Sequence, residues 1–364
     1  MNVLRSLMLV SAPADERLRQ QVREGRRPRP EYLRLEEEGV ELLDWSLLGR
    51  PPSGRTWIGS ARHARAAMRR VRDLDVVFSD GEQVGVPLAL AMIARGVKTP
   101  HLMLGHRLTT RHKRPFFTVL KCHRGMSRIL LHSKHQLYGI QQTLGIPAEK
   151  LALVPYFADG AFWRPRRGSA EKLVVSAGRE QRDYETLVQA CTHPEIPLYI
   201  ADGSVHSPHA NHRQPSRWPA NVQAGFADYV QLRDLYARAA VVAIPLLEND
   251  FQAGVTTILE AMAMGKPIVV SATSGQGDVQ GDVIEDGVTG MTVPPGDPSR
   301  LREAIRFLMD NPSERRRLGR NAREAFESRF TLDRYAAALL EQMHLIAAGH
   351  PQEKAHHRSP QVTT

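Results

Sequence analysis

The sequence predicts an α/β fold in which two Rossmann-like domains face each other across a cleft. Short apolar runs alternate with longer helical segments through most of the 364 residues, a pattern typical of parallel sheets built from strand–helix–strand units. The pattern breaks at the Arg/Pro-rich residues 164–168 and then starts again. We therefore predict one domain at residues 1–165, a second at residues 166–347, and a disordered polar tail at residues 348–364.

The first half opens with an expected strand at residues 7–10. No glycine-rich dinucleotide fingerprint follows this strand, and the Arg-Pro-Arg-Pro segment at residues 27–30 is expected to be a mobile loop. The other elements expected in this half are strands at 74–78, 101–104, 128–132 and 151–154 and helices at 84–94 and 134–144.

The second half repeats the alternation and closes with helices. The last of these helices begins behind Thr331, whose hydroxyl is a suitable N-cap. Strands are expected at 173–177, 198–201, 222–226, 241–244 and 268–271, and helices at 183–191, 301–309, 313–327 and 332–347.

Positive charge is concentrated in the first half. Residues 1–168 carry 29 Lys and Arg against 15 Asp and Glu, within a net charge of +10 for the whole chain. This excess of positive charge has two interpretations. It could bind an anionic membrane surface or a lipid-phosphate carrier, or it could belong to a solvent-exposed surface that is rich in arginine. The same two interpretations hold for Arg62, Arg65, Arg69 and Arg72, which recur at helical spacing. No aromatic platform interleaves the basic residues, so we expect no nucleic-acid partner.

Cysteine content and hydropathy indicate a cytoplasmic protein. The two cysteines, Cys122 and Cys191, are far apart and form no disulfide framework, which favours a reducing compartment. No apolar run of 18 residues is present for a membrane helix. Peripheral contact with the inner face of the membrane remains an open alternative.

The stretch FQAGVTTILEAMAMGKPIVVS, residues 251–271, contains the main candidate ligand site. Its helix follows the loop at the carboxyl end of the expected strand 241–244, where ligands bind in open α/β sheets. This helix would open with Gly254, Val255, Thr256 and Thr257. Its first backbone N–H groups would be free, the glycine would let an anion approach closely, and the threonine hydroxyls would donate hydrogen bonds, so the position suits a phosphate. Glu260, one turn further, would accept hydrogen bonds from a sugar attached to that phosphate. The alternative is a solvated glutamate on a surface helix.

This region resembles the donor-binding part of retaining GT-B glycosyltransferases of family 4. In that family a Glu-x7-Glu motif precedes a segment similar to Ala261-Met262-Ala263. The resemblance implies that Glu260 holds the ribose of a nucleotide sugar. The first glutamate of the motif is replaced here by Gln252, which keeps hydrogen-bonding capacity but loses the charge at the donor sugar. Glu248 or Asp250 would compensate only through a loop shift.

Further positions extend the resemblance over residues 74–340. Gly178 and Arg179 resemble the family's Gly-Arg turn, and Arg182 stands nearest to its phosphate-binding lysine. Phe226 lies in a segment similar to the loop near the nucleotide base. His106 matches a histidine that meets a donor-sugar hydroxyl, although a lone histidine is also commonly structural.

The resemblance implies a hexosyltransferase that moves a sugar from a nucleoside-diphosphate sugar to a glycan, lipid-linked or small-molecule acceptor, with retention of configuration. His106, Gln252 and Glu260 are its expected catalytic residues. No cofactor and no metal are expected, because helix N–H groups and arginines would stabilise the leaving diphosphate. The alternatives are a nucleotide-sugar epimerase and a non-catalytic nucleotide-sugar-binding protein of the same fold.

Three other patterns are weaker candidates. Asp73-Leu74-Asp75 is similar to a metal-binding D-x-D motif, but it precedes an expected strand and is interpreted as structural. His206, His209 and His212 lie in a Pro/Ser/Asn-rich segment, which favours a loop over a zinc site. Glu82 is interpreted either as a contact for an acceptor hydroxyl or as a turn residue.

Overall fold

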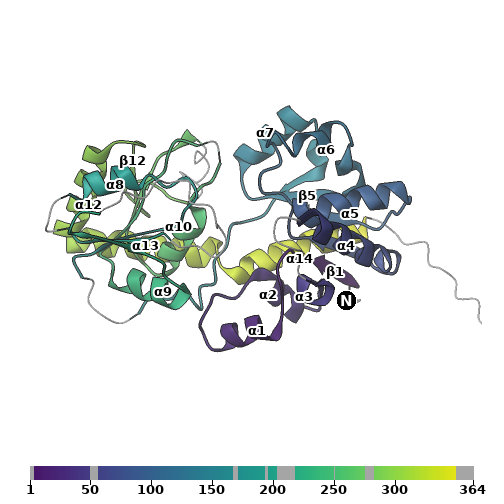
Figure 1. Ribbon diagram of the computed structural model, residues 1–364, viewed down its shortest axis with the longest axis horizontal. Helices are drawn as coiled ribbons and strands as arrows, with labels where there is room; N and C mark the ends of the chain where they lie inside the picture. Colours follow the sequence, from purple (N-terminus) through teal and green to yellow (C-terminus); the bar gives the residue numbers. More distant parts are fainter. Residues whose placement is uncertain are drawn as a thin grey trace, which may run out of the picture.

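The structure is a computed structural model that describes residues 4–49, 56–166, 171–192, 196–202, 218–249, 251–274 and 283–349. It contains two six-stranded parallel sheets, each covered by helices (Figure 1). The predicted α/β class with two Rossmann-like halves is confirmed.

The first sheet has the strand order β2-β1-β3-β4-β5-β6. Its strands are β1 (Ser6–Leu9), β2 (Glu41–Leu43), β3 (Val76–Ser79), β4 (His101–Leu104), β5 (Arg128–Leu131) and β6 (Leu151–Leu153). The helices around it are α1 (Glu16–Arg23), α2 (Glu31–Glu37), α3 (Trp45–Leu48), α4 (Thr56–Met68), α5 (Glu82–Ala94), α6 (Arg114–Thr118) and α7 (Lys134–Leu144), with short 3-10 turns η1 (Val71–Asp73), η2 (Cys122–Gly125) and η3 (Ala148–Lys150).

The second sheet has the order β12-β11-β10-β7-β8-β9. Its strands are β7 (Val174–Ala177), β8 (Leu198–Ala201), β9 (Val222–Gly225), β10 (Val241–Ile244), β11 (Ile268–Ser271) and β12 (Met291–Val293). Its helices are α8 (Tyr184–Ala190), α9 (Tyr229–Arg238), α10 (Val255–Ala263), α12 (Pro298–Asp310) and α13 (Pro312–Arg329). The chain runs outward from β7 to β9 and then returns to build the other side from β10. The order therefore reverses between β7 and β10, and such a switch point is where these sheets bind ligands.

The central strands are buried on both faces. Every residue of β1, β3, β4, β7, β10 and β11 is buried. Helices cover both sides of a parallel sheet, so its strands consist of apolar runs without alternation. This burial explains why the apolar runs located these strands well in the sequence.

The closing helix α14 (Leu332–Ala348) joins the two halves. It follows α13 of the second half and extends to the first half, where it packs beside α2 (Figure 1). Tyr335, Leu339 and Met343 are buried in the same core cluster as Phe78 of β3. The hydroxyl of Thr331 caps its first turn by accepting from the backbone N–H of Arg334 at 3.3 Å, as the sequence predicts.

Several short elements have no clear signal in the sequence. Helices α1 and α2 flank residues 27–30, and β2 and β12 are three-residue strands at the sheet edges. Residues 27–30 form a loop, as expected, but this loop is anchored, because the N–H of Arg29 donates to Asp159 Oδ2 at 2.7 Å. Residues 350–364, most of the expected tail, lie outside the described residues, and α14 continues to Ala348.

Both cysteines are buried free thiols. Cys122 lies in the core of the first half and Cys191 in the core of the second. In the described ranges, no helix combines the length and the apolar character needed to cross a bilayer.

Candidate functional site

Helix α10 begins at the switch point with an uncapped N-terminus. Its N-cap, Gly254, has φ +83°, and no side chain caps the first turn. A Cβ at Gly254 would lie 3.0 Å from Ile244 Cγ2, so both backbone conformation and space require glycine here. The backbone N–H groups and positive dipole end of α10 are consequently directed at the loop edge of the sheet, an arrangement that suits an anion.

Glu260 lies within this helix and is buried. Every residue of α10 from Thr257 to Ala263 is buried, and Glu260 is 7% exposed, so the alternative of a solvated glutamate is wrong. The hydroxyl of Tyr236, on α9, donates to Glu260 Oε2 at 3.2 Å. Burial raises the pKa of Glu260 to about 8, against the opposing effects of this hydrogen bond and of the Arg182 charge.

Arg182 joins the two loops at the switch point. Its side chain donates to the carbonyl oxygens of Ala177 (2.8 Å) and Glu180 (2.9 Å) and to the hydroxyl of Thr257 in α10 (3.1 Å). Gly178 leaves room for it, because a Cβ there would lie 2.5 Å from an Arg182 amino nitrogen. Burial lowers the pKa of this guanidinium. Four of the predicted site residues therefore meet here: Gly178, Arg182, Gly254 and Thr257.

Backbone hydrogen bonds also connect these loops. The N–H of Asp183 donates to Pro245 O at 3.1 Å, and the N–H of Leu247 donates to Gln181 O at 3.0 Å. The loop after β7 and the loop after β10 are therefore joined in front of α10.

The other predicted donor residues lie at the same edge. Arg179 is in the β7 loop, with its Nε donating to the carbonyl oxygen of Asp202 after β8. Phe226 follows β9, and its side chain is 62% exposed. Val255 and Thr256 open α10, with Thr256 exposed to solvent. These residues are available on the surface, whereas Arg182 and Glu260 lie beneath it.

The first half contributes a charged cluster around His106, which follows β4. His106 Nδ1 lies 3.3 Å from Glu82 Oε2, and Lys113 forms an ion pair with the same carboxylate. Burial opposes protonation, but the hydrogen bond and charge of Glu82 outweigh it and raise the pKa of His106. Burial likewise opposes ionisation of Glu82, yet His106 and Lys113 lower its pKa. Glu82 is thus the first residue of α5 and an ion-pair partner rather than a free turn residue.

Three contacts join the first half of the chain to the donor loops. Arg107, next to His106, lies 3.6 Å from Glu180 in the β7 loop, and its guanidinium stands 4.0 Å from the ring centre of Phe251. The amide of Gln252 donates to Ser133 Oγ, the N-cap of α7, at 2.6 Å. The loops that carry His106 and Gln252 therefore lie where the two halves of the chain touch.

Glu248, one candidate substitute for the missing glutamate, is engaged with another loop. Its exposed carboxylate accepts hydrogen bonds from the backbone N–H and the hydroxyl of Ser274 at 2.8 and 2.5 Å, which lower its pKa. Asp250, the other candidate, lies outside the described residues. Gln252 is a polar side chain that makes a contact between the halves.

The Asp73-Leu74-Asp75 segment lies away from the cleft. Asp75 accepts from the backbone N–H and the guanidinium of Arg5 at 2.8 and 2.9 Å, at the end of the sheet opposite the cleft loops. No group of three potential metal ligands occurs among the residues that the structure describes. His206, His209 and His212 fall outside those residues.

Sequence comparisons relate the second half to a known family. Residues 162–325 match the model of glycosyl transferases group 1. The chain is 25% identical over 350 residues to MMP alpha-(1->4)-mannosyltransferase of Mycolicibacterium hassiacum, covering 85% of this chain and 79% of that protein. It is 28% identical over 211 residues to glycogen synthase of Mycobacterium tuberculosis, covering 55% and 49% of the two chains, so it spans about half the length of that relative.

Structural comparisons cover most of the chain. The crystal structure of Anabaena HepE with UDP and glucose is similar with a TM-score of 0.69 and 16% identity, over 94% of this chain and 99% of that one. A glycosyltransferase from Rickettsia africae gives a TM-score of 0.68 at 14% identity, over 96% and 100%. These likenesses show the shared GT-B fold. Residues 162–325 are therefore similar to glycosyl transferases group 1, and the chain shares its fold with solved glycosyltransferases.

Proposed function

We propose that the protein is a retaining glycosyltransferase of family 4, which moves a sugar from a nucleoside-diphosphate sugar to a glycan or lipid-linked acceptor. One observation carries the proposal: a buried carboxyl group, Glu260, lies one turn behind an uncapped, glycine-led helix N-terminus at the switch point of the second sheet. In this proposal residues 1–165 bind the acceptor and residues 166–347 bind the donor.

The diphosphate would rest on the first turn of α10. The N–H groups of Val255 and Thr256, with the side chains of Arg179 and Arg182, supply positive electrostatic potential at this point. Bond cleavage places additional negative charge on the leaving diphosphate, and fixed donors stabilise that charge without a metal ion. The lowered pKa of buried Arg182 supports this role, because a nearby anion would offset its cost of burial.

The sugar and the base would lie on either side of the diphosphate. Glu260 would accept from the ribose hydroxyls, and Phe226 would lie near the base. His106 and Gln252, which lie in loops of opposite halves that touch each other, would contact the transferred sugar. The acceptor hydroxyl would attack from the face that the diphosphate leaves, and its proton would pass to a donor phosphate oxygen. Attack on that face would retain the anomeric configuration of the transferred sugar.

Calorimetric titration with UDP, GDP and ADP tests this proposal. UDP is the first probe, since HepE was crystallised with it. We expect one nucleotide to bind selectively and its sugar derivative to be consumed when an acceptor is present. Consumption without any acceptor would instead indicate an epimerase, and tight binding without turnover would indicate a non-catalytic protein. If the folded protein binds none of the three, the donor-site proposal is wrong.

Peripheral membrane contact is the second part of the proposal, and it rests on a surface around α6. The apolar–basic patch combines exposed Phe116, Val119 and Leu120, which are 40%, 74% and 52% exposed, with the exposed cations Arg111, Arg114 and Arg124. Apolar side chains flanked by cations suit an anionic bilayer surface. Arg62 and Arg65 of α4 and the following Arg69 and Arg72 are also exposed, and α4 packs beside α5, which in turn contacts η2, the turn that carries Arg124.

Co-sedimentation with lipid vesicles tests the patch. We expect the protein to pellet with phosphatidylglycerol vesicles and not with phosphatidylcholine vesicles, and the double variant Val119→Ser/Leu120→Ser to bind about tenfold more weakly. Leu47→Ser is the matched control, because Leu47 is 67% exposed on α3, away from the patch. Equal binding of the double variant and the control would show that the patch has no role.

A further inference from the structure

A second pocket lies where the chain crosses between the two halves. Its volume is about 420 Å³, and it is lined by the end of α1 and the loop after it, the crossover segment 159–164, one residue of α9, two residues of α13, and the start of α14. No residue of the donor loops, 178–182 and 254–260, lines it. It is therefore separate from the proposed donor site.

Arginine dominates this crossover pocket. Five arginines line it, against two aspartates: Arg27, Arg29, Arg164, Arg233 and Arg323, with Asp159 and Asp333. Four of these seven charged side chains already have partners, three of them outside the pocket. Arg29 pairs with Glu37, Arg323 with Glu327, and Asp333 with Arg34. Asp159 accepts from the backbone N–H groups of residues 29, 161 and 162.

Three guanidinium groups remain without a carboxylate. Arg27, Arg164 and Arg233 form no ion pair with any residue in the described ranges. The Nε atoms of Arg27 and Arg233 are moreover buried and have no hydrogen-bond partner there. Buried donors of this kind are normally satisfied in folded proteins, so their position at a pocket points to a missing acceptor.

Arg27 and Arg233 are half-buried, and each guanidinium group stacks on an aromatic ring. Arg233 lies over Phe162 at 4.4 Å from the ring centre, and Arg27 lies over Tyr229 at 5.6 Å. Stacking fixes the guanidinium plane and leaves its N–H edge for hydrogen bonds. Burial lowers the pKa of Arg233, and the neighbouring charges of Arg166 and Arg164 lower it further. An anion placed between these guanidinium groups would offset the repulsion of their positive charges and raise the pKa of Arg233.

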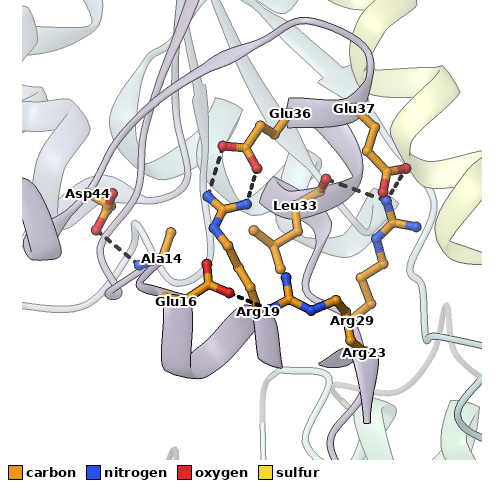
Figure 2. Close-up of polar contacts among 9 residues, drawn as sticks. All are labelled: Ala14, Glu16, Arg19, Arg23, Arg29, Leu33, Glu36, Glu37 and Asp44. Atoms are coloured by element: carbon orange, nitrogen blue, oxygen red, sulfur yellow. Dashed lines mark hydrogen bonds and ion pairs between the residues drawn. The ribbon is translucent and has the colours of Figure 1, made fainter. Parts of the chain in front are cut away.

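The loop that carries Arg27 is braced on both sides. Figure 2 shows Arg29 bound to Glu37 and to the carbonyl oxygen of Leu33, and Arg19 of α1 bound to both carboxylate oxygens of Glu36 of α2. The loop also meets the second half, because Arg233 donates to the carbonyl oxygen of Gly25 at 3.4 Å. Arg27 is thus pre-organised at the pocket, which limits the entropy lost on binding a ligand.

We propose that the crossover pocket binds the phosphoryl group of a small phosphorylated ligand through Arg27, Arg164 and Arg233. Phosphate oxygens accept two parallel hydrogen bonds from a guanidinium, and three such groups surround the pocket. Arg27 comes from the first half and Arg233 from the second, so a bound ligand joins the halves beside the crossover. This binding site goes beyond the proposed glycosyl transfer and does not depend on it.

Calorimetric titration of the full chain with inorganic pyrophosphate tests the proposal. We expect the double variant Arg27→Gln/Arg233→Gln to bind at least about tenfold more weakly than wild type. Arg26→Gln is the matched control and should bind as wild type, because Arg26 is exposed, pairs with Glu24 and does not line the pocket. The single variant Arg164→Gln changes an exposed residue and should weaken binding even if the double variant folds poorly.

A second titration separates this pocket from the donor site. The pyrophosphate titration of wild type is repeated at a saturating concentration of the nucleotide that the donor site selects. We expect wild type to keep, under these conditions, the pyrophosphate binding that the double variant lacks. If no nucleotide binds, the first titration still tests the pocket, because its variants leave the donor loops intact. Unchanged binding in both Arg164→Gln and the double variant, or no binding by wild type, would overturn the proposal.

Discussion

Replacement of Glu260 by Ala is expected to weaken nucleoside-diphosphate binding about 100-fold. The proposed ribose contacts are hydrogen bonds to a carboxylate in a buried position, and each such bond contributes about 1.5–3 kcal/mol. The variant should remain folded, since alanine favours helix and the removed group carries a desolvation cost in the free protein. Titration calorimetry with the selected nucleotide measures the loss. Glu185→Gln, an exposed glutamate in the first turn of α8, is the matched control.

The same residue gives the binding a dependence on pH. Burial raises the pKa of Glu260 from its ordinary value of 4.5 to about 8, so most molecules are protonated at this position at pH 7. If ribose binds the ionised form, that proton must be released, and affinity should rise about tenfold between pH 7 and pH 9. Glu260→Gln cannot ionise and should show no rise. An identical pH profile for wild type and Glu260→Gln would show that Glu260 does not titrate on binding.

The free energy of unfolding should fall as pH rises, whereas the nucleotide affinity should increase. Between pH 4.5 and about 8 the folded protein holds a proton on Glu260 that the unfolded chain has released. A group that binds more protons in the folded state loses stability as pH rises, so this contribution falls through that window. Urea unfolding at pH 5 and pH 8.5 measures it, and Glu260→Gln should reduce the fall.

Much of this arrangement could be predicted from the sequence, because its cause is local. Gly254 is required by a positive φ and by contact with Ile244, and the helix behind it follows directly along the chain. The parallel strands were visible as apolar runs, because helices bury them on both faces. The strand order then places the β7 and β10 loops next to each other at the switch point.

Other features depend on contacts between distant segments. Arg179 and Arg182 occupy the same turn and look alike in sequence, but only Arg182 is buried, because Gly178 leaves room for its guanidinium. Gln252 meets Ser133 only because the two halves approach each other, across 119 positions of sequence. The arginines of the crossover pocket likewise come from distant segments of the chain. In the sequence, each of them alone would be predicted to be exposed to solvent. Helix α1 could not be predicted because its eight residues bury only Leu18.

Arg182→Met is expected to destabilise the protein by about 3 kcal/mol and to abolish measurable nucleotide binding. The substitution keeps an unbranched apolar stem but removes the guanidinium group and its three hydrogen bonds, to Ala177 O, Glu180 O and Thr257 Oγ1. Each buried partner left unsatisfied costs about 1–3 kcal/mol, and loss of the desolvated charge recovers part of that cost. The loop after β7 would also lose its connection to α10, so the diphosphate donors would no longer be held together.

Arg179→Met separates the structural role from the ligand role. Arg179 is only partly buried and bonds the carbonyl oxygen of Asp202, so we expect a stability loss below about 1 kcal/mol together with clearly weaker nucleotide binding. Urea unfolding and calorimetry of both variants measure the two effects separately. If Arg182→Met unfolds at the wild-type urea concentration, the buried arginine does not hold the loops. If Arg179→Met binds nucleotide as wild type does, the diphosphate depends on Arg182 and the α10 N-terminus alone.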